Sequence, residues 1–225
     1  MVAHIIMYTY TEDGGTSSCS VHSTSSQVVR NLAEKAFFKL NSCIDQKRIK
    51  HAVAGAEAQR AIRSNAWREK QARGRLSRKI VLVREIANKI VSESAVVVLH
   101  IDGDEPLSGQ ESKTPFRSNE LVDAVEEAVS AQEGSGNQVR GTLLCMFPYY
   151  SIESWLYLKA EALSDSSRLW VEKNVSDTTG LDHIEKPKDK CPIGSRVNLS
   201  LSELWSVETA CRKSPSWKAL MDAWS

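Results

Sequence analysis

The chain has 225 residues, of which 41% are apolar and 25% are charged, and its formal net charge is +1. This length is sufficient for one sizeable hydrophobic core, and the balance of apolar and charged residues excludes a disordered chain and a fibrous one. No stretch approaches the roughly 18 consecutive apolar residues of a membrane-spanning helix. We therefore predict no membrane partner.

Two further features indicate the cellular compartment. The first eight residues lack a basic leader and a long apolar block, so we interpret them as part of a first strand and not as a signal peptide. The five cysteines are widely spaced and include no Cys-x-x-Cys pair, which is typical of free thiols in a reducing compartment. We expect a cytoplasmic protein that forms a single domain over residues 1–225.

The N-terminal part predicts a strand followed by a helix. Residues 4–10 are rich in Ile, Met and Tyr and precede the turn sequence Thr11-Glu12-Asp13-Gly14-Gly15, which favours a strand. A loop rich in Ser and Thr follows over residues 16–26. Either Ser25 or Ser26 is expected to cap a helix that continues to Leu40.

Residues 45–92 form a basic segment with helical composition. They contain no proline, and abundant Ala, Arg, Lys, Gln and Glu predict a long helix, or a helical pair broken near Gly74, inserted into the fold. An apolar stripe between Ile80 and Ile90 is expected to pack on a sheet. Residues 46–90 carry thirteen Lys or Arg against three acids, a balance of +10, whereas the rest of the chain carries −9. Such polarity favours a polyanionic partner.

The second half of the chain continues the alternation of strands and helices. Residues 95–101 are a near-continuous apolar run, typical of a central parallel strand buried on both faces. Helices are predicted over 118–132 and 152–163, with a strand over 141–147 between them. Residues 178–225 are expected to be irregular up to residue 196 and then helical over 201–212 and 216–224. The pattern predicts an α/β fold, a mostly parallel sheet flanked by helices.

Acidic residues follow two of the predicted strands. Glu12 and Asp13 follow the first strand, and Asp102 and Asp104 follow the central one. Loops at the carboxyl ends of parallel strands converge, so we expect these acids to meet in space. Gly103 lets the backbone turn so that two carboxylates approach one ion, and Mg²⁺ prefers such oxygen ligands. The structural alternative is a loop in which the acids cap turns or the next helix.

Four short segments, in this order, resemble the Toprim superfamily and its small RloB-like and OLD-type nucleases. The first two are the strand that ends in Glu12 near Gly14 and the apolar strand that ends in Asp102-Gly103-Asp104. The others are Ile152-Glu153-Ser154-Trp155-Leu156, similar to a Glu-Ala-Trp-Leu segment, and Ser214-Pro215-Ser216-Trp217, similar to a Ser-Pro-Ser-Phe ending. The family has Gly directly after its first Glu, whereas Asp13 intervenes here, so either Glu12 or Asp13 takes that part.

The resemblance implies a metal-dependent nuclease that cleaves DNA or RNA. Asp102 and Asp104 would bind Mg²⁺ or Mn²⁺, and Glu12 would act as general acid/base or as a further ligand. Glu153 would be a fourth acid near the site, with a first-turn acid favoured by the helix dipole as the alternative. The resemblance also implies a role in bacterial anti-phage defence with a separate ABC-type ATPase partner.

The densest basic group is expected to contact a phosphate backbone, with an acidic partner protein as the alternative. Its members are Arg68, Lys70, Arg73, Arg75, Arg78 and Lys79. His100, inside the apolar strand, is interpreted as a hydrogen-bonded core residue rather than a catalytic one.

Several kinds of chemistry are disfavoured because their motifs are absent from the sequence. The chain contains no Gly-x-x-x-x-Gly-Lys-Ser/Thr loop, no Gly-x-Gly-x-x-Gly fingerprint and no Gly-x-Ser-x-Gly elbow. Two alternatives to the nuclease stay open. One is a non-catalytic module that binds nucleic acid or protein, and the other is a HAD-like phosphotransferase with Asp102 as its nucleophile.

Overall fold

The structure is a computed structural model that describes residues 4–11, 24–42, 44, 48–63, 78–101, 116–132, 140–148, 152–156, 193–213 and 215–224. The chain divides into two compact units, which are described separately. Unit 1 contains the β-sheet and the helices that connect its strands β2, β3 and β4. Unit 2 contains the helix that follows β1 and the C-terminal helices.

Unit 1 is built on a parallel four-stranded sheet in the order β2-β1-β3-β4. β1 pairs in parallel with both of its neighbours, and in one of these pairs Met7 lies opposite Val96 and Thr11 opposite His100. β3 is buried along its whole length, as the continuous apolar run predicts. The predicted α/β fold class is confirmed. The strands are β1 (Ile5–Thr11), β2 (Ile49–Ala52), β3 (Val96–His100) and β4 (Thr142–Met146).

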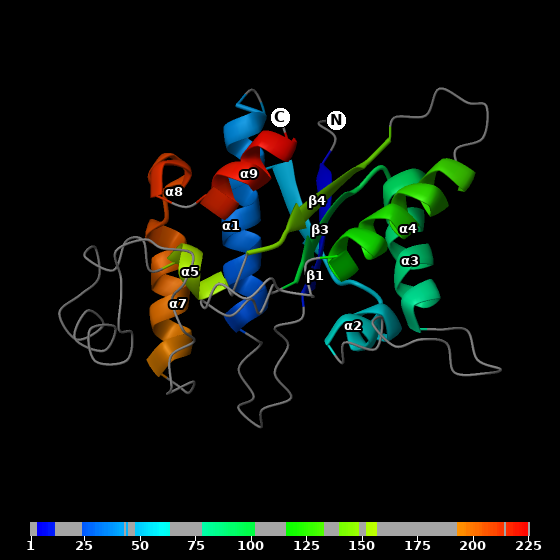
Figure 1. Cartoon of the computed structure of the whole chain (residues 1–225), viewed down its shortest axis with the longest axis horizontal. Helices are drawn as coiled ribbons and strands as arrows, with labels where there is room; N and C mark the ends of the chain where they lie inside the picture. Colours follow the sequence, from blue (N-terminus) through cyan, green and yellow to red (C-terminus); the bar gives the residue numbers. More distant parts are fainter. Residues whose placement is uncertain are drawn as a thin grey trace. The chain divides into compact units, whose positions relative to one another are not determined.

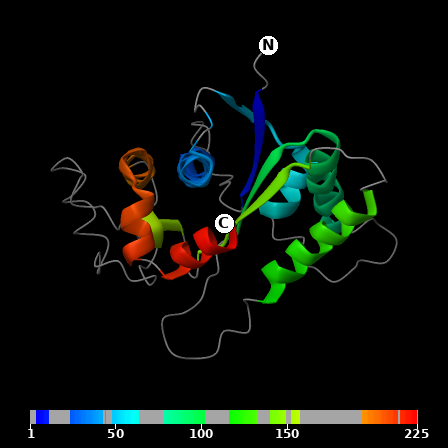
Figure 2. The ribbon, with the colours of Figure 1, turned by 90° about the horizontal axis from the view of Figure 1, so that it is seen from above.

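Three helices of unit 1 lie on one side of this sheet (Figures 1 and 2). They are α2 (Ala56–Arg63), α3 (Arg78–Ser92) and α4 (Phe116–Gln132). α3 contacts both α2 and α4 as well as β3. Its buried side chains follow helical spacing, which is why one stripe of the helix faces the core. They are Leu82, Val83, Ile86, Ala87 and Ile90.

The prediction of a purely helical insertion over residues 45–92 is wrong in one respect. Ile49–Ala52 forms the edge strand β2, which pairs with β1 from Ile5 to Tyr8. Four residues with two exposed side chains give only a weak strand pattern, and pairing with the neighbouring strand decides their conformation. The segment therefore contributes a strand and two packed helices to the unit.

In the described part of unit 2, the first two helices that follow residue 192 pack on α1 (Thr24–Leu40). Asn31 donates a hydrogen bond to Ser202 Oγ over 2.8 Å, and Lys35 Nζ donates to the carbonyl oxygen of Trp205 over 2.8 Å. The prediction of an irregular segment up to residue 196 is wrong from Ile193 onward, because packing against α1 stabilises a helix there. The other helices are α5 (Ile152–Leu156), α7 (Ile193–Leu204), α8 (Val207–Lys213) and α9 (Pro215–Trp224).

Three tryptophans form the centre of unit 2. The Trp217 ring meets Trp155 and Trp205 edge to face, with ring centroids 4.8 Å and 4.3 Å apart. Trp205 Nε1 donates a hydrogen bond to the carbonyl oxygen of Trp155 over 3.0 Å. Such pairs add directional stability to the burial of the rings, so these side chains belong to packing. None of the helices in the described ranges combines the length and the apolarity required to cross a membrane.

Candidate functional site

The strand order creates a topological switch point between β1 and β3. From β1 the chain continues to β2, at one lateral edge of the sheet. From β3 it continues to β4, at the opposite lateral edge. Thr11 and His100, the last residues of the two strands, are register partners. Ligand sites in open parallel sheets form outside the carboxyl ends of the strands at such a point. We call this end of unit 1, where β1 and β3 finish, the carboxyl edge.

A buried hydrogen bond joins the ends of these two strands. Thr11 Oγ1 lies 2.9 Å from His100 Nδ1, and the two residues are 1% and 0% exposed. Either the hydroxyl donates to an unprotonated Nδ1, or a protonated Nδ1 donates to the hydroxyl oxygen. The interpretation of His100 as a hydrogen-bonded core residue agrees with this contact. The pair links the ends of the two strands that lead into the acidic segments.

Thr9 offers a contrast on the same face of β1. It is also buried, at 3% exposure, but its Oγ1 has no hydrogen-bond partner among the described residues. Two threonines with equal shape and similar burial therefore differ in whether the hydroxyl has a described hydrogen-bond partner.

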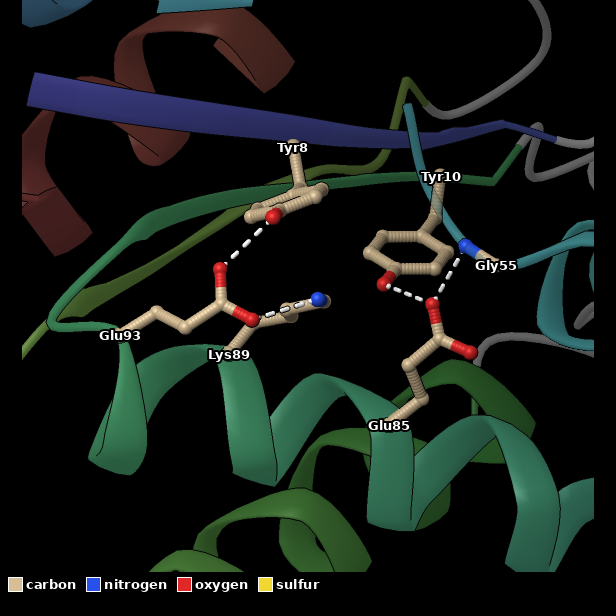
Figure 3. Close-up of polar contacts among 6 residues, drawn as sticks. All are labelled: Tyr8, Tyr10, Gly55, Glu85, Lys89 and Glu93. Atoms are coloured by element: carbon tan, nitrogen blue, oxygen red, sulfur yellow. Dashed lines mark hydrogen bonds and ion pairs between the residues drawn. The ribbon is translucent and has the colours of Figure 1, made fainter. Parts of the chain in front are cut away.

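On the opposite face, two tyrosines of β1 connect the sheet to α3 (Figure 3). Tyr8 Oη donates to Glu93 Oε2 over 2.6 Å, and Tyr10 Oη donates to Glu85 Oε1 over 2.8 Å. The hydrogen bond to Glu93 raises the pKa of Tyr8, and burial together with Glu85 raises the pKa of Tyr10. Both phenols therefore remain protonated donors at neutral pH.

Lys89 completes this polar layer. Its Nζ lies 2.6 Å from Glu93 Oε1 and 4.4 Å from the centroid of the Tyr8 ring. Burial raises the pKa of the Glu93 carboxyl, but the hydrogen bonds from Lys89 and Tyr8 outweigh it and hold that pKa below its usual value. The carboxylate is therefore ionised and fully engaged, as a structural tie between β1 and α3 (Figure 3).

These contacts fix the direction of α3. Tyr8 donates to Glu93, which directly follows the last residue of α3. Tyr10, further along β1, donates to Glu85 in the middle of the helix. α3 therefore runs antiparallel to β1. Arg78 precedes Glu85 by about 10 Å of helix, whereas Thr11 lies only about 3.3 Å beyond Tyr10. The first turn of α3, with Arg78 and Lys79, thus lies at the carboxyl edge (Figure 1).

α2 is attached to the same region of β1. The ladder with β2 ends where Ala52 pairs with Tyr8, and Gln59 Nε2 donates to the next carbonyl oxygen, that of Thr9, over 2.6 Å. Gly55 N, just before α2, donates to Glu85 Oε1 over 2.6 Å. The Gln59 side-chain amide therefore donates a hydrogen bond to β1 just beyond the last backbone pair with β2. This bond holds α2 beside the end of β1.

Most of the predicted site residues lie outside the described residues. This holds for the acids Glu12, Asp13, Asp102 and Asp104, and for the basic residues Arg68, Lys70, Arg73 and Arg75. Glu153 lies within α5, but its side chain is outside the described set. Within the ranges that the structure describes, no group of three or more His, Cys, Asp or Glu has the arrangement of a metal site.

The structure adds residues that sequence reasoning did not single out. Thr11, Gln59 and Arg63 lie in or near the carboxyl edge, the last as an exposed cation one helical turn after Gln59. The signal in the sequence was the position of Thr11 at the end of a strand and the basic character of residues 46–90. Nothing local in the sequence indicated the partners of Thr11 or Gln59, because each partner is distant along the chain.

Known proteins were compared with the chain in three ways. Neither the protein-family models, nor the curated proteins, nor the solved structures gave a match.

Proposed function

We propose that this protein is a Mg²⁺- or Mn²⁺-dependent nuclease with a Toprim-like core. One observation carries the proposal: β1 and β3 end as hydrogen-bonded neighbours at the switch point of the sheet. Glu12 follows Thr11 directly in the chain, and Asp102 lies two residues after His100. The two acidic segments are thus covalently attached to adjacent strand ends at the usual ligand-binding edge of this architecture.

The donor chemistry of these segments suits a hard divalent cation. Carboxylate oxygens are the protein ligands that Mg²⁺ prefers, and such an ion usually keeps several waters. In this proposal Asp102 and Asp104 hold the ion and Glu12 or Asp13 adds a carboxylate. When bound, the ion neutralises charge on the phosphodiester and lowers the pKa of water.

The remaining roles belong to side chains of the chain itself. Glu12 accepts a proton from the attacking water and returns one to the leaving oxygen. Basic residues at the carboxyl edge hold the phosphate backbone of DNA or RNA in register with the acids. Glu153 stays a candidate for a fourth acid. The family resemblance adds a separate ABC-type ATPase as partner in a defence system, and the lack of a phosphate-binding loop in the sequence fits this division of labour.

The test is cleavage of DNA and RNA by the wild-type chain and by two single variants, Asp102→Asn and Asp123→Asn. Asp123 is an exposed acid on α4 and receives the same substitution as a control. We expect cleavage that requires Mg²⁺ or Mn²⁺, a loss of at least about a hundredfold in Asp102→Asn, and wild-type rates in Asp123→Asn.

Other outcomes would select the alternatives. Nucleic-acid binding without cleavage, unaffected by Asp104→Asn, would identify a binding module. An acid-stable phosphate on Asp102 would identify a HAD-like phosphotransferase. Cleavage that continues in Asp102→Asn without added metal would refute the proposed function.

A further inference from the structure

Three cations of the described residues stand at helix ends toward the carboxyl edge of unit 1. Arg63 ends α2, and Arg78 and Lys79 begin α3. Arg63 and Arg78 are exposed and Lys79 is half-buried, and none of the three makes an ion pair with another described residue. Unpaired cations at one end of a sheet create a local positive potential.

The described part of the segment that carries these cations contains few acids. Between residues 48 and 92 the described acids are Glu57 and Glu85. Glu85 accepts hydrogen bonds from Tyr10 and from the Gly55 amide, so its carboxylate faces the interior contact between β1 and α3 (Figure 3). The Glu85 carboxylate is therefore engaged in these hydrogen bonds and forms no described ion pair with Arg63 or Arg78.

The opposite end of the sheet is arranged differently. Arg140 lies two residues before β4 begins, and its guanidinium pairs with Glu126 of α4 over 2.5 Å. Arg48 directly precedes β2, so it is an exposed cation at this amino edge. Arg48 is thus an exposed arginine at the opposite end of the parallel strands from Arg63 and Arg78, which makes it a matched control.

We propose that the carboxyl edge binds the phosphate backbone of a nucleic acid through Arg63, Arg78 and Lys79. This inference takes its ligand class from the proposed nuclease function. A guanidinium pairs with two oxygens of one phosphate at once, and an extended polyanion can engage the end of α2 and the start of α3 together. The Gln59 hydrogen bond to β1 fixes α2 in position for this contact.

A nucleic acid fits this edge better than an acidic protein does. The cations lie at the end of the sheet where β1 and β3 lead into the acidic segments, so a bound backbone approaches the proposed cleavage site. Binding through backbone phosphates also predicts little dependence on base sequence and a strong dependence on salt.

The experiment compares the full chain with Arg63→Gln, Arg78→Gln and the control Arg48→Gln. Binding of a fluorescent single-stranded and a double-stranded oligonucleotide is measured by anisotropy in EDTA, between about 50 and 200 mM salt. Each substitution removes one exposed charge. We expect Arg63→Gln and Arg78→Gln to weaken binding about threefold to tenfold and to reduce the salt slope by about 1, whereas Arg48→Gln leaves both unchanged.

The possible results separate the two proposals. Because EDTA excludes cleavage, a nuclease that fails its own test leaves this binding result unaffected. Equal weakening in all three variants would show diffuse attraction and overturn the assignment to the carboxyl edge. Unchanged binding in Arg63→Gln and Arg78→Gln would overturn it as well.

A chain that binds polyglutamate but neither oligonucleotide would show that the partner is an acidic protein. Circular dichroism confirms that each variant folds, and Lys79→Gln replaces any that does not.

Discussion

Replacing either Thr9 or Thr11 by valine should change the stability of unit 1 in opposite directions. Both threonines lie on β1 and are buried, and valine keeps the branched shape of each side chain. The substitution therefore isolates the hydroxyl group. Thr11 loses its hydrogen bond with His100, whereas Thr9 loses a hydroxyl that has no partner among the described residues.

The magnitudes follow from the cost of buried polar groups. Removing one partner of a buried hydrogen bond costs about 1–3 kcal/mol, so Thr11→Val should lower the free energy of unfolding by that amount. Removing a buried hydroxyl without a partner relieves a desolvation cost, so Thr9→Val should raise the free energy of unfolding by about 1 kcal/mol. The two variants should thus differ by about 2–4 kcal/mol.

Urea unfolding followed by far-ultraviolet circular dichroism measures both values. Thr11→Ser retains the hydroxyl and should recover most of the stability that Thr11→Val loses. The reasoning is refuted if Thr9→Val is as destabilised as Thr11→Val, or if Thr11→Ser is no more stable than Thr11→Val. Either result would mean that shape, and not the hydrogen bond, determines the contribution of these positions.

Three further predictions concern other contacts. Gly55→Ala should destabilise the chain by about 1–3 kcal/mol, because the new Cβ would overlap the Glu85 carboxylate and displace it from its hydrogen bonds; a smaller loss of unfolding free energy in the Glu85→Ala background tests the cause. Because Lys89 and Tyr8 lower the pKa of Glu93 despite its burial, its contribution to stability is complete above the usual value of 4.5 and is lost as the pH falls through the lowered pKa. Glu93→Gln should flatten the dependence of the urea midpoint on pH below about 5, and an unchanged slope would contradict this assignment. Trp217→Ala should cost about 3–5 kcal/mol, seen as a lower urea midpoint by tryptophan fluorescence, and a loss below about 1 kcal/mol would show that unit 2 does not depend on its ring contacts.

Much of the local structure could be predicted from periodicity. The run of apolar residues at 95–101 predicted the central strand, which spans Val96–His100. The apolar stripe that begins at Ile80 predicted the packed face of α3. The strand β2 could not be predicted, because Ile49–Ala52 is short and half exposed, and only the edge of β1 supplies its hydrogen bonds. The helix that begins at Ile193 likewise depends on packing against α1.

The candidate site, like the fold, could be predicted from the sequence only in part. The order of residues determined that acids follow two strands and that cations concentrate between residues 46 and 90, since both are properties of composition and spacing. Only the tertiary structure decided that β1 and β3 are neighbours, that Thr11 meets His100, and that α3 begins at the carboxyl edge. The physical reason is that strand pairing and helix direction arise from contacts between residues about 75 to 90 positions apart, which no local pattern in the chain encodes.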